Sequence, residues 1–568
     1  MSAWHDIPGE IRFSILELVV AGKPQPTYSE PGVGQYFWAP FAAVSREWRD
    51  FFERRTFAST ALFNNDVQPF CKAVTRCPCR LTYIRRLRLT VDLPEYGCDQ
   101  CQTGEDAATV KRNNVIFTRY LWPLLHALAA WTPPGPGEPQ PLMRNDAMFR
   151  AEKLNSAIGI QFELGVRSPS DAQHAFLDYR IRHPHRHVYG FCDLPKYLED
   201  ERNSAQHNSA AHGWSHGIRI TLPSYGAVTR VLGAQPLEFD ADGLGGDIGP
   251  DADADADAGT DALLETERGE RYRLRHAPPA AAIVRKLVLG RRFYRALHPA
   301  TVSHLLTACF PHVQYVHLEP WRPVDTANAN VMERGFRGLL ASLPPSLLNL
   351  TIYVEHNINT IHSHVPTLTR RTPDPYLGRL LAENSSQLEV VNVAHLVEAD
   401  DFFATAARRL HATTTWSRLH TLVLTSSTLA PASTDAAIEG LLVEAAVVAA
   451  CMPQLRRLEL WYANSADVFV FTYDVSSSRQ ATICIRTQWN WPLRRPLLAN
   501  VERAWRDMHN TKTWAASELR LVHWPFRQSA VQMDARRLVL WTDTLTRKLM
   551  FKQSLEDMQL EGLFYMFM

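Results

Sequence analysis

The chain has 568 residues, of which 46% are hydrophobic and 21% charged, and this ordinary globular composition excludes membrane and disordered proteins as classes. Its 60 lysines and arginines nearly balance 59 aspartates and glutamates, so no basic excess indicates nucleic-acid binding. The length predicts roughly two to four domains.

The first expected elements are two short helices within residues 4–55. Ile7-Pro8 places a proline at a helix start, where its missing N–H leaves no hydrogen bond unmade. Apolar residues follow at helical spacing in this first helix: Ile7, Ile11, Ile15, Leu16, Leu18 and Val19. A second helix, about residues 40–54, repeats that spacing with Phe41, Val44, Trp48, Phe51 and Phe52. Helices this short cannot bury enough surface alone, so they need the rest of the chain or another protein.

These residues carry a resemblance to a known family. The pattern Ile7-Pro8-x-Glu10-Ile11-x-x-x-Ile15-Leu16, closed by Val44-Ser45-Arg46-Glu47-Trp48, resembles an F-box-like domain of the type found in filamentous fungi. It spans residues 1–60, with an insertion rich in proline and glycine at 22–38. A weaker similarity extends to about residue 190 through three segments: 96–101, 112–114 and 167–171.

From residue 84 onward, a pattern of three apolar residues at intervals of three and two recurs along the chain. Such alternation predicts a half-buried strand. The copies are Ile84-Leu87-Leu89, Val284-Leu287-Leu289, Val313-Val316-Leu318, Leu347-Leu350-Ile352, Leu388-Val391-Val393, Leu419-Leu422-Leu424, Leu455-Leu458-Leu460 and Ala535-Leu538-Leu540. Helical spacing between copies predicts helices at residues 300–309, 331–343, 375–383, 399–410 and 436–451.

A strand followed by a helix that cannot cover its own apolar face is the unit of a leucine-rich repeat. The expected fold class is therefore α/β, with a short N-terminal helical F-box-like domain followed by an irregular leucine-rich-repeat-like solenoid of parallel strands and helices. The alternative is an ordinary α/β domain with a parallel sheet, because a single copy of the pattern carries little information.

Four regions are expected in chain order. Residues 1–60 form the F-box-like domain, and residues 61–236 an irregular N-terminal repeat region with a helix at 112–131 and strands at 158–166 and 217–222. Residues 237–268 form an acidic, disordered loop rich in Asp, Ala and Gly. Residues 269–568 form the solenoid and its cap, and its last expected elements are a hairpin at 468–473 and 481–485, a helix at 497–510, a strand at 518–522 and a cap at 549–568.

The cysteines raise the question of a metal. Cys77-x-Cys79 and Cys98-x-x-Cys101 could supply four thiolates to zinc, but the single intervening residue in the first pair strains chelation. Structural thiols or a disulfide-capable loop are favoured instead, so neither metal nor cofactor is expected. The histidines at 183, 185, 187, 207, 212 and 216 lie among polar residues and are expected in solvated loops.

Neither a membrane span nor a secretory signal is expected. The longest apolar candidate, residues 441–452, is interrupted by Glu444 and is shorter than the ~20 residues that cross a bilayer. The N-terminus lacks a basic region followed by an apolar stretch. Nine cysteines, an odd number, indicate reduced thiols and a cytoplasmic or nuclear location.

No enzyme is expected, because the sequence contains no GxSxG, HExxH, Walker or kinase motif. The Asp-rich segment 251–257 places Ala258 where a calcium-binding EF-hand needs glycine. Eight aromatic residues near strand ends could anchor a partner or fill the core, and core packing is favoured. They are Trp321, Tyr353, Trp416, Trp461, Tyr462, Trp489, Trp491 and Trp524.

The resemblance implies a substrate-recruiting adaptor in ubiquitin-dependent degradation, with the box docked on a Skp-type linker and through it on a cullin. The solenoid then binds an unidentified protein substrate, and neither nucleic acid nor membrane is a partner. By motif match, the linker contacts are Ile7, Pro8, Ile11, Ile15, Leu16, Val44 and Trp48. The alternative is a non-catalytic scaffold or protein-binding module outside any ligase, whose N-terminal helices serve only as its cap.

Overall fold

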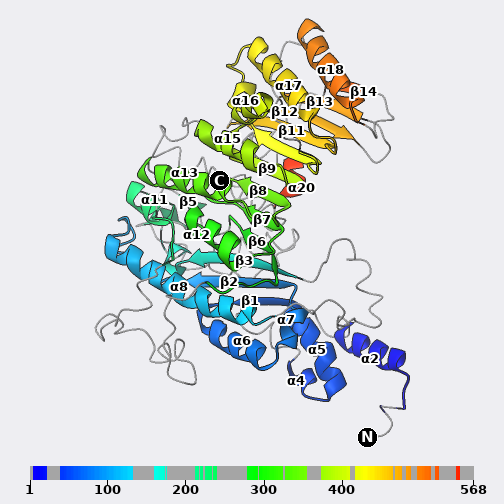
Figure 1. Cartoon of the computed structure of the whole chain (residues 1–568). Coiled ribbons are helices and arrows are strands. Elements are labelled where there is room, and N and C mark those ends of the chain that lie inside the picture. The colour runs from blue at the N-terminus through cyan, green and yellow to red at the C-terminus, as the bar shows by residue number, and fades with distance from the viewer. Residues whose placement is uncertain are drawn as a thin grey trace. The chain divides into compact units, whose positions relative to one another are not determined.

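The structure is a computed structural model of the whole chain (Figure 1). It describes residues 4, 6–21, 39–131, 159–172, 174, 212–215, 218–219, 221, 224–232, 234–239, 278–291, 293–323, 326–354, 373–409, 416–464, 467–475, 481–487, 495–512, 519–523 and 545–550. The expected insertion at 22–38, the acidic loop expected at 237–268 from residue 240 onward, the strand copy at 535–540 and the cap beyond residue 550 lie outside these residues.

The chain divides into two compact units that interleave along the sequence. The first comprises Met1–Cys101, Lys111–Pro223 and Asp240–Arg285. The second comprises Gln102–Val110, Ser224–Phe239 and Lys286–Met568. None of the helices in the described part of the chain is long and apolar enough to cross a membrane.

The first unit begins with three helices, α2 (Gly9–Ala21), α4 (Ala39–Ala42) and α5 (Arg46–Ala58). Ser45 caps α5 by accepting a hydrogen bond from the backbone N–H of Trp48, as its position before the helix favours. A small core forms where Leu16 of α2 packs with Phe51 and Phe52 of α5. The first helix lies where the helical spacing predicts it, whereas the single second helix expected at about residues 40–54 is divided into α4 and α5, which leaves Val44 between them.

A parallel sheet follows, in the order β1 (Ser59–Leu62), β2 (Arg86–Asp92) and β3 (Ile160–Arg167). The strand expected at 158–166 is thus confirmed, as is the helix expected at 112–131. The remaining elements of the first unit are α6 (Asn64–Arg76), α7 (Cys79–Tyr83), α8 (Ala107–Ala129), the 3-10 turn η2 (Pro169–Ala172), β4 (Trp214–Ser215) and β5 (Ile218–Arg219). Helix α6 was not predicted from the sequence.

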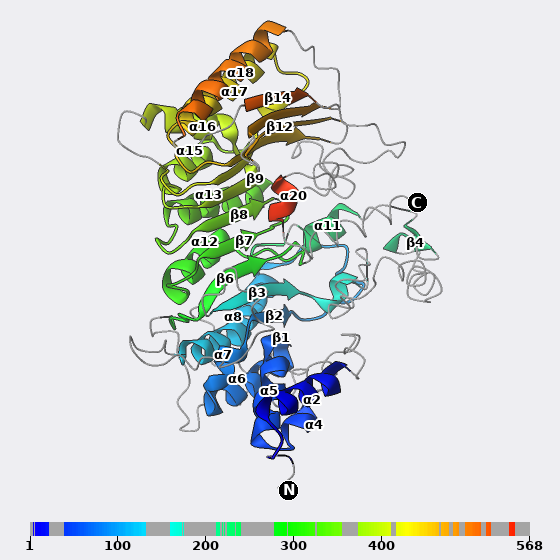
Figure 2. The ribbon, with the colours of Figure 1, turned by 90° about the vertical axis from the view of Figure 1, so that its right-hand side faces the viewer.

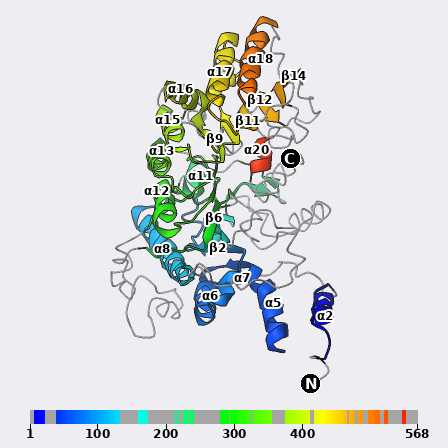
Figure 3. The ribbon, with the colours of Figure 1, turned by 45° about the vertical axis from the view of Figure 1, so that its right-hand side comes forward.

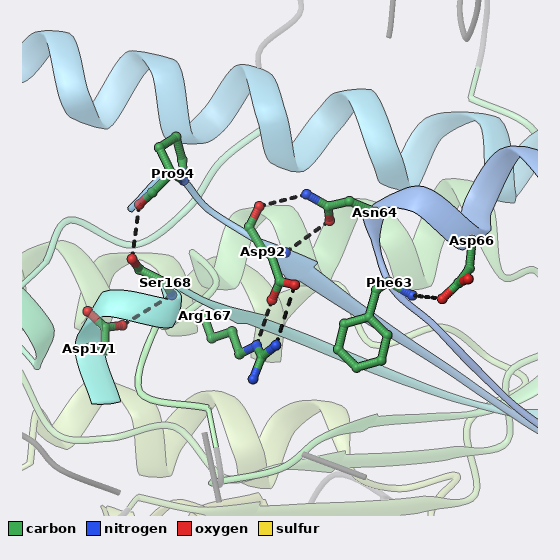
Figure 4. A network of polar contacts seen from close by, with 8 residues as sticks. All are labelled: Phe63, Asn64, Asp66, Asp92, Pro94, Arg167, Ser168 and Asp171. Carbon is green, nitrogen blue, oxygen red and sulfur yellow. Dashed lines mark hydrogen bonds and ion pairs between the residues drawn. The ribbon is translucent and has the colours of Figure 1, made fainter. Parts of the chain in front are cut away.

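A polar network fixes the carboxyl ends of β2 and β3 (Figure 4). The Asn64 side chain pairs with the backbone of Asp92, donating to its carbonyl at 2.7 Å and accepting from its N–H at 2.9 Å. The Asp92 carboxylate in turn accepts a hydrogen bond from Nε of Arg167 on β3 at 2.6 Å. One residue further on, Ser168 donates to the carbonyl of Pro94 at 2.9 Å. The loops that leave β2 and β3 are therefore held together where they start.

The second unit is built on strands that run side by side, in the order β6-β7-β8-β9-β10-β11-β12-β13-β14 (Figure 2). The first six pair in parallel, β12 and β13 form an antiparallel hairpin, and β14 is parallel to β13. Their bounds are β6 (Val284–Leu289), β7 (Tyr315–Leu318), β8 (Asn349–Tyr353), β9 (Val390–Glu398), β10 (Thr421–Thr425), β11 (Arg457–Ala463), β12 (Val468–Val475), β13 (Ala481–Thr487) and β14 (Leu519–His523). The strands, the hairpin and the late strand expected in this unit are confirmed wherever the structure describes them.

The register of the parallel strands follows the apolar pattern of the sequence. The second apolar residue of each copy pairs with the second residue of the next, and all six are buried: Leu287, Val316, Leu350, Val391, Leu422 and Leu458. A shift by one residue would turn this apolar ladder to the other face of the sheet. The period-two pattern thus fixes both the strands and their alignment.

Helices line one face of this sheet, and consecutive helices pack against one another (Figures 1 and 3). They are α12 (Pro299–His304) with the π-helical turn η7 (Leu305–Cys309), α13 (Thr326–Ala341), α15 (Pro375–Asn384), α16 (Ala399–Arg409), α17 (Asp435–Ala449) and α18 (Arg495–Asn510). The unit also contains α11 (Tyr225–Val231) and the 3-10 turn η10 (Ser427–Leu429). On the opposite face α20 (Leu545–Leu549) and Met550 pack over Val423, Trp461 and Val470. Burial of both faces explains why these strands are apolar throughout.

Candidate functional site

The N-terminal helices present an apolar surface to solvent. Ile11 is 52% exposed and Val44 is 61% exposed, and Pro8 is exposed as well. Ile7, Ile15 and Trp48 are half-buried. Among the seven residues expected to contact a partner, six therefore keep some exposure.

Leu16 differs from the other six, because it is only 1% exposed and packs against Phe51 and Phe52. Its side chain supports the helical unit and is not available at the surface. Leu18, in contrast, is 69% exposed although the sequence did not single it out as a contact. It follows Ile11 by seven residues, which places both on one side of α2.

Two charged pairs hold α2 on α5. Arg12 donates from Nε to Glu47 at 3.0 Å, and the indole of Trp4 donates to the same carboxylate at 2.9 Å. Arg55 pairs with Glu17 at the other end of the contact. The relative position of the two helices, and with it the exposed surface, is therefore defined without a partner.

Trp48 stabilises this unit from within. Its ring lies 5.7 Å from that of Phe52, 6.0 Å from that of Trp4 and 6.4 Å from that of Phe41, measured between centroids. Aromatic contacts of this kind contribute to stability beyond the area they bury. A truncation of Trp48 would therefore disturb the helices themselves as well as any partner contact.

The cysteines are not arranged as four zinc ligands. Cys77 is disulfide-bonded to Cys79, which agrees with the disulfide-capable loop and not with the reduced thiols that the sequence left as alternatives for this pair. Cys98 and Cys101 are not in a disulfide and lie beside His174 and His212 instead. His212, expected in a solvated loop, is half-buried, and burial together with the nearby His174 lowers its pKa. His183, His185, His187, His207 and His216 lie outside the described residues.

The aromatic residues expected near strand ends are mainly core residues. Trp416 and Trp461 are fully buried, and Trp321 and Tyr353 are each 3% exposed. Tyr462 is half-buried, whereas Trp489, Trp491 and Trp524 lie outside the described residues. The favoured interpretation, core packing, holds for the buried members.

An acidic cluster lies where β9 meets β10. The register shifts there, so that Val393 pairs with Leu424 but Glu398 pairs with the next residue, Thr425. Glu398 accepts a hydrogen bond from the N–H of Ser427 at 2.6 Å. Burial raises the pKa of the Glu398 carboxyl to about 7, although that hydrogen bond acts against the shift, and repulsion from Asp400 adds to it.

This pKa predicts a pH dependence of stability. A glutamate in an unfolded chain titrates near pH ~4.3, so between about pH 4 and about pH 7 the folded chain keeps a proton that the unfolded chain loses. The free energy of unfolding is therefore expected to fall with rising pH across that window, by about 3 kcal/mol, and to level off above it. Urea unfolding at about pH 5 and about pH 8 measures the change, and Glu398→Gln should reduce it. An equal pH response in wild type and variant would contradict the assignment.

Comparison with known proteins gives one match. Residues 342–541 match a family of unknown function (DUF6546), which covers β8 to β14 of the second unit. No curated protein and no solved structure matches the chain. The comparisons therefore add no activity, ligand or partner to what the residues themselves indicate.

Proposed function

We propose that the chain is a non-catalytic, substrate-recruiting adaptor of a Skp-cullin-F-box type ubiquitin ligase. In this proposal α2, α4 and α5 are an F-box-like domain that docks a Skp-type linker and through it a cullin. The strands and helices of the second unit bind a protein substrate. The chain acts in the cytoplasm or nucleus, and catalysis belongs to the partner subunits.

The observation that carries the proposal is the exposure of Ile11, Leu18 and Val44 next to a formed core. The helical unit buries Leu16, Phe51 and Phe52 and still leaves these three large apolar side chains in solvent. Helices that served only as a cap would turn such residues toward the strand they cover. Large apolar side chains that stay exposed on a formed unit instead favour a protein partner.

The second unit supports the other half of the proposal. Its aligned ladder of apolar residues and its row of mutually packed helices are what a leucine-rich-repeat-like solenoid requires. Such a unit offers an extended surface to a protein substrate. By holding that substrate beside the ligase, the adaptor would raise its effective concentration at the site of ubiquitin transfer.

The test uses substitutions at exposed positions, so that folding is preserved. Ile11→Glu and Val44→Glu each place a charge on the apolar surface and are expected to weaken binding of a purified Skp-type linker by about tenfold or more. Isothermal titration calorimetry of the full chain measures the affinity. Val447→Glu is the matched control, because Val447 is 49% exposed on α17 of the second unit.

The outcome separates the two candidate functions. Loss of binding in both N-terminal variants, with the control unchanged, supports the adaptor. Wild-type chain that does not bind the linker, or binding unaffected by either substitution, contradicts it. The alternative function is then favoured: a protein-binding scaffold outside any ligase, whose N-terminal helices form its cap.

A further inference from the structure

Four metal-ligating side chains from three distant segments of the first unit converge beyond the carboxyl ends of β2 and β3. Cys98 and Cys101 lie on the loop after β2, His174 lies just beyond η2, and His212 precedes β4. The ligand atoms of Cys98, His174 and His212 all lie within 4.8 Å of one another. Sγ of Cys101 does not belong to that group of three, but lies 3.5 Å from Nε2 of His212 and 3.2 Å from the carbonyl oxygen of Cys98.

We infer that Cys98, Cys101, His174 and His212 form a structural zinc site. Zinc binds thiolate sulfur at about 2.3 Å and imidazole nitrogen at about 2.0 Å, so a tetrahedral site places sulfur about 3.6 Å from nitrogen and the two nitrogens about 3.3 Å apart. In the structure, Sγ of Cys98 lies 3.6 Å from Nδ1 of His174, and Nδ1 of His174 lies 3.3 Å from Nε2 of His212. The contact between Cys101 and His212 agrees as well.

Hydrogen bonds do not account for the two contacts at Nδ1 of His174. Nε2 of His174 lies 3.1 Å from the carbonyl of Tyr96, which can only accept, so this nitrogen carries the proton. Nδ1 of a neutral His174 then has a single lone pair in the ring plane. Two groups approach it, the Cys98 sulfur and the His212 nitrogen, and one lone pair cannot accept from both. A cation placed between these three atoms would accept a lone pair from the Cys98 sulfur and from each of the two imidazole nitrogens.

The surroundings of His174 are those of a metal ligand. A ligating histidine ordinarily donates its other N–H to a carbonyl or carboxylate, which fixes the ring. Here the carbonyl of Tyr96 does so, and the Tyr96 ring stacks on the imidazole at 5.4 Å between centroids. The Tyr96 hydroxyl donates to Asp171 at 2.9 Å, and the Asp171 carboxylate accepts from the N–H of Ser168 at 3.2 Å. The network at the ends of β2 and β3 thus continues to the ligands.

The ligand set identifies the metal and its role. Two thiolates and two imidazoles are soft and borderline donors that suit zinc and not calcium or magnesium, which take oxygen ligands. Four protein ligands leave no open position for water or substrate, so the site is structural and not catalytic. It ties the loop after β2, the segment after β3 and the segment around His212 to one point.

The test measures metal in the full chain purified from zinc-supplemented cells. Mass spectrometry of the metal is expected to find about one zinc ion per chain, and Cys98→Ser and His212→Ala are expected to lower it at least about tenfold. Two control variants should keep the zinc: Cys77→Ser/Cys79→Ser, and a triple alanine variant at His183, His185 and His187. Zinc that persists in the Cys98 and His212 variants, or disappears from either control, overturns the assignment.

Cobalt provides a readout that does not depend on the folding of a variant. Wild-type chain stripped by a chelator and titrated with Co²⁺ is expected to develop the visible bands of tetrahedral cobalt and a thiolate-to-cobalt charge-transfer band, saturating at about one equivalent. Added Zn²⁺ should displace the cobalt. A titration without a thiolate band overturns the proposal.

Discussion

Replacement of Arg295 by methionine is expected to cost the second unit about 3–5 kcal/mol of unfolding free energy. Arg295 donates from Nη1 to Glu105 at 2.7 Å and to the carbonyl of Arg230 at 2.9 Å. The side chains of the pair are only 3% and 6% exposed. Methionine has a similar length but no donor, so the substitution removes the positive charge that faces the buried Glu105 carboxylate.

Urea unfolding of single and double variants measures this effect. Arg295→Met with Glu105→Leu removes both charges and is expected to recover most of the lost stability, because a buried pair often contributes little compared with apolar residues. The control is Arg418→Met, since Arg418 pairs with Glu389 at the surface and its side chain is 52% exposed. That change should cost at most about 1 kcal/mol. Equal costs for Arg295→Met and Arg418→Met would contradict the argument.

The same contact explains a feature of the chain that the sequence did not predict. Segments Gln102–Val110 and Ser224–Phe239 belong to the second unit although both precede its first strand. Arg295 joins the two, across sequence separations of 190 and 65 residues. An ion pair between residues so far apart in the sequence cannot be predicted from the hydrophobic pattern, because that pattern reports only on residues within one helix or strand.

Regular elements were predictable because their signal is local. An apolar residue at the same position of successive copies predicted the ladder from Leu287 to Leu458, and the strands align on it. Each copy must bury the same residues against the next helix, so its pattern is repeated in the sequence.

The zinc ligands were predictable only in part. The spacing of Cys98 and Cys101 is visible in the sequence, but Cys77 and Cys79 were considered as their partners because they are close along the chain. Strand β2 lies between the two pairs, and seven residues of extended chain carry them roughly 20 Å apart. The actual neighbours, His174 and His212, are 76 and 111 residues away from the cysteines they contact.

The apolar surface of α2 shows a similar limit. Ile11 and Leu16 are five residues apart, which places them about 140° apart around a helix. One therefore faces solvent and the other faces α5. The sequence of α2 is apolar over a wide arc, so spacing alone could not indicate which side α5 covers.

The largest single loss from a core substitution in the region matched by DUF6546 is expected at Trp505. This residue of α18 is fully buried, and its indole N–H donates to the carbonyl of Leu442 on α17 at 3.0 Å. The ring lies 5.0 Å from that of Phe471 and 5.2 Å from that of Tyr473, both on β12. Trp505→Ala should cost about 3–5 kcal/mol, because it removes these contacts and leaves a cavity.

Two further variants on α18 make the prediction specific. Trp505→Phe keeps most of the ring but loses the hydrogen bond, and is expected to cost about 1–2 kcal/mol. Arg506→Ala changes a side chain that is 52% exposed and should lie within about 0.5 kcal/mol of wild type. Urea unfolding that gives the same midpoint for Trp505→Ala and Arg506→Ala would show that α18 is not anchored as described.

The position of Trp505 explains why its loss should be felt beyond α18. At β12 the sheet changes from parallel to antiparallel pairing, so no crossover helix between β11 and β12 covers this part of the sheet. Helix α18 covers the apolar residues Phe471 and Tyr473 there and also packs on α17. Trp505 contacts both neighbours, and Trp505→Ala should therefore increase hydrogen exchange in the amides of β12 and β13 more than in those of β7 and β8. Uniform protection across these strands would contradict this role.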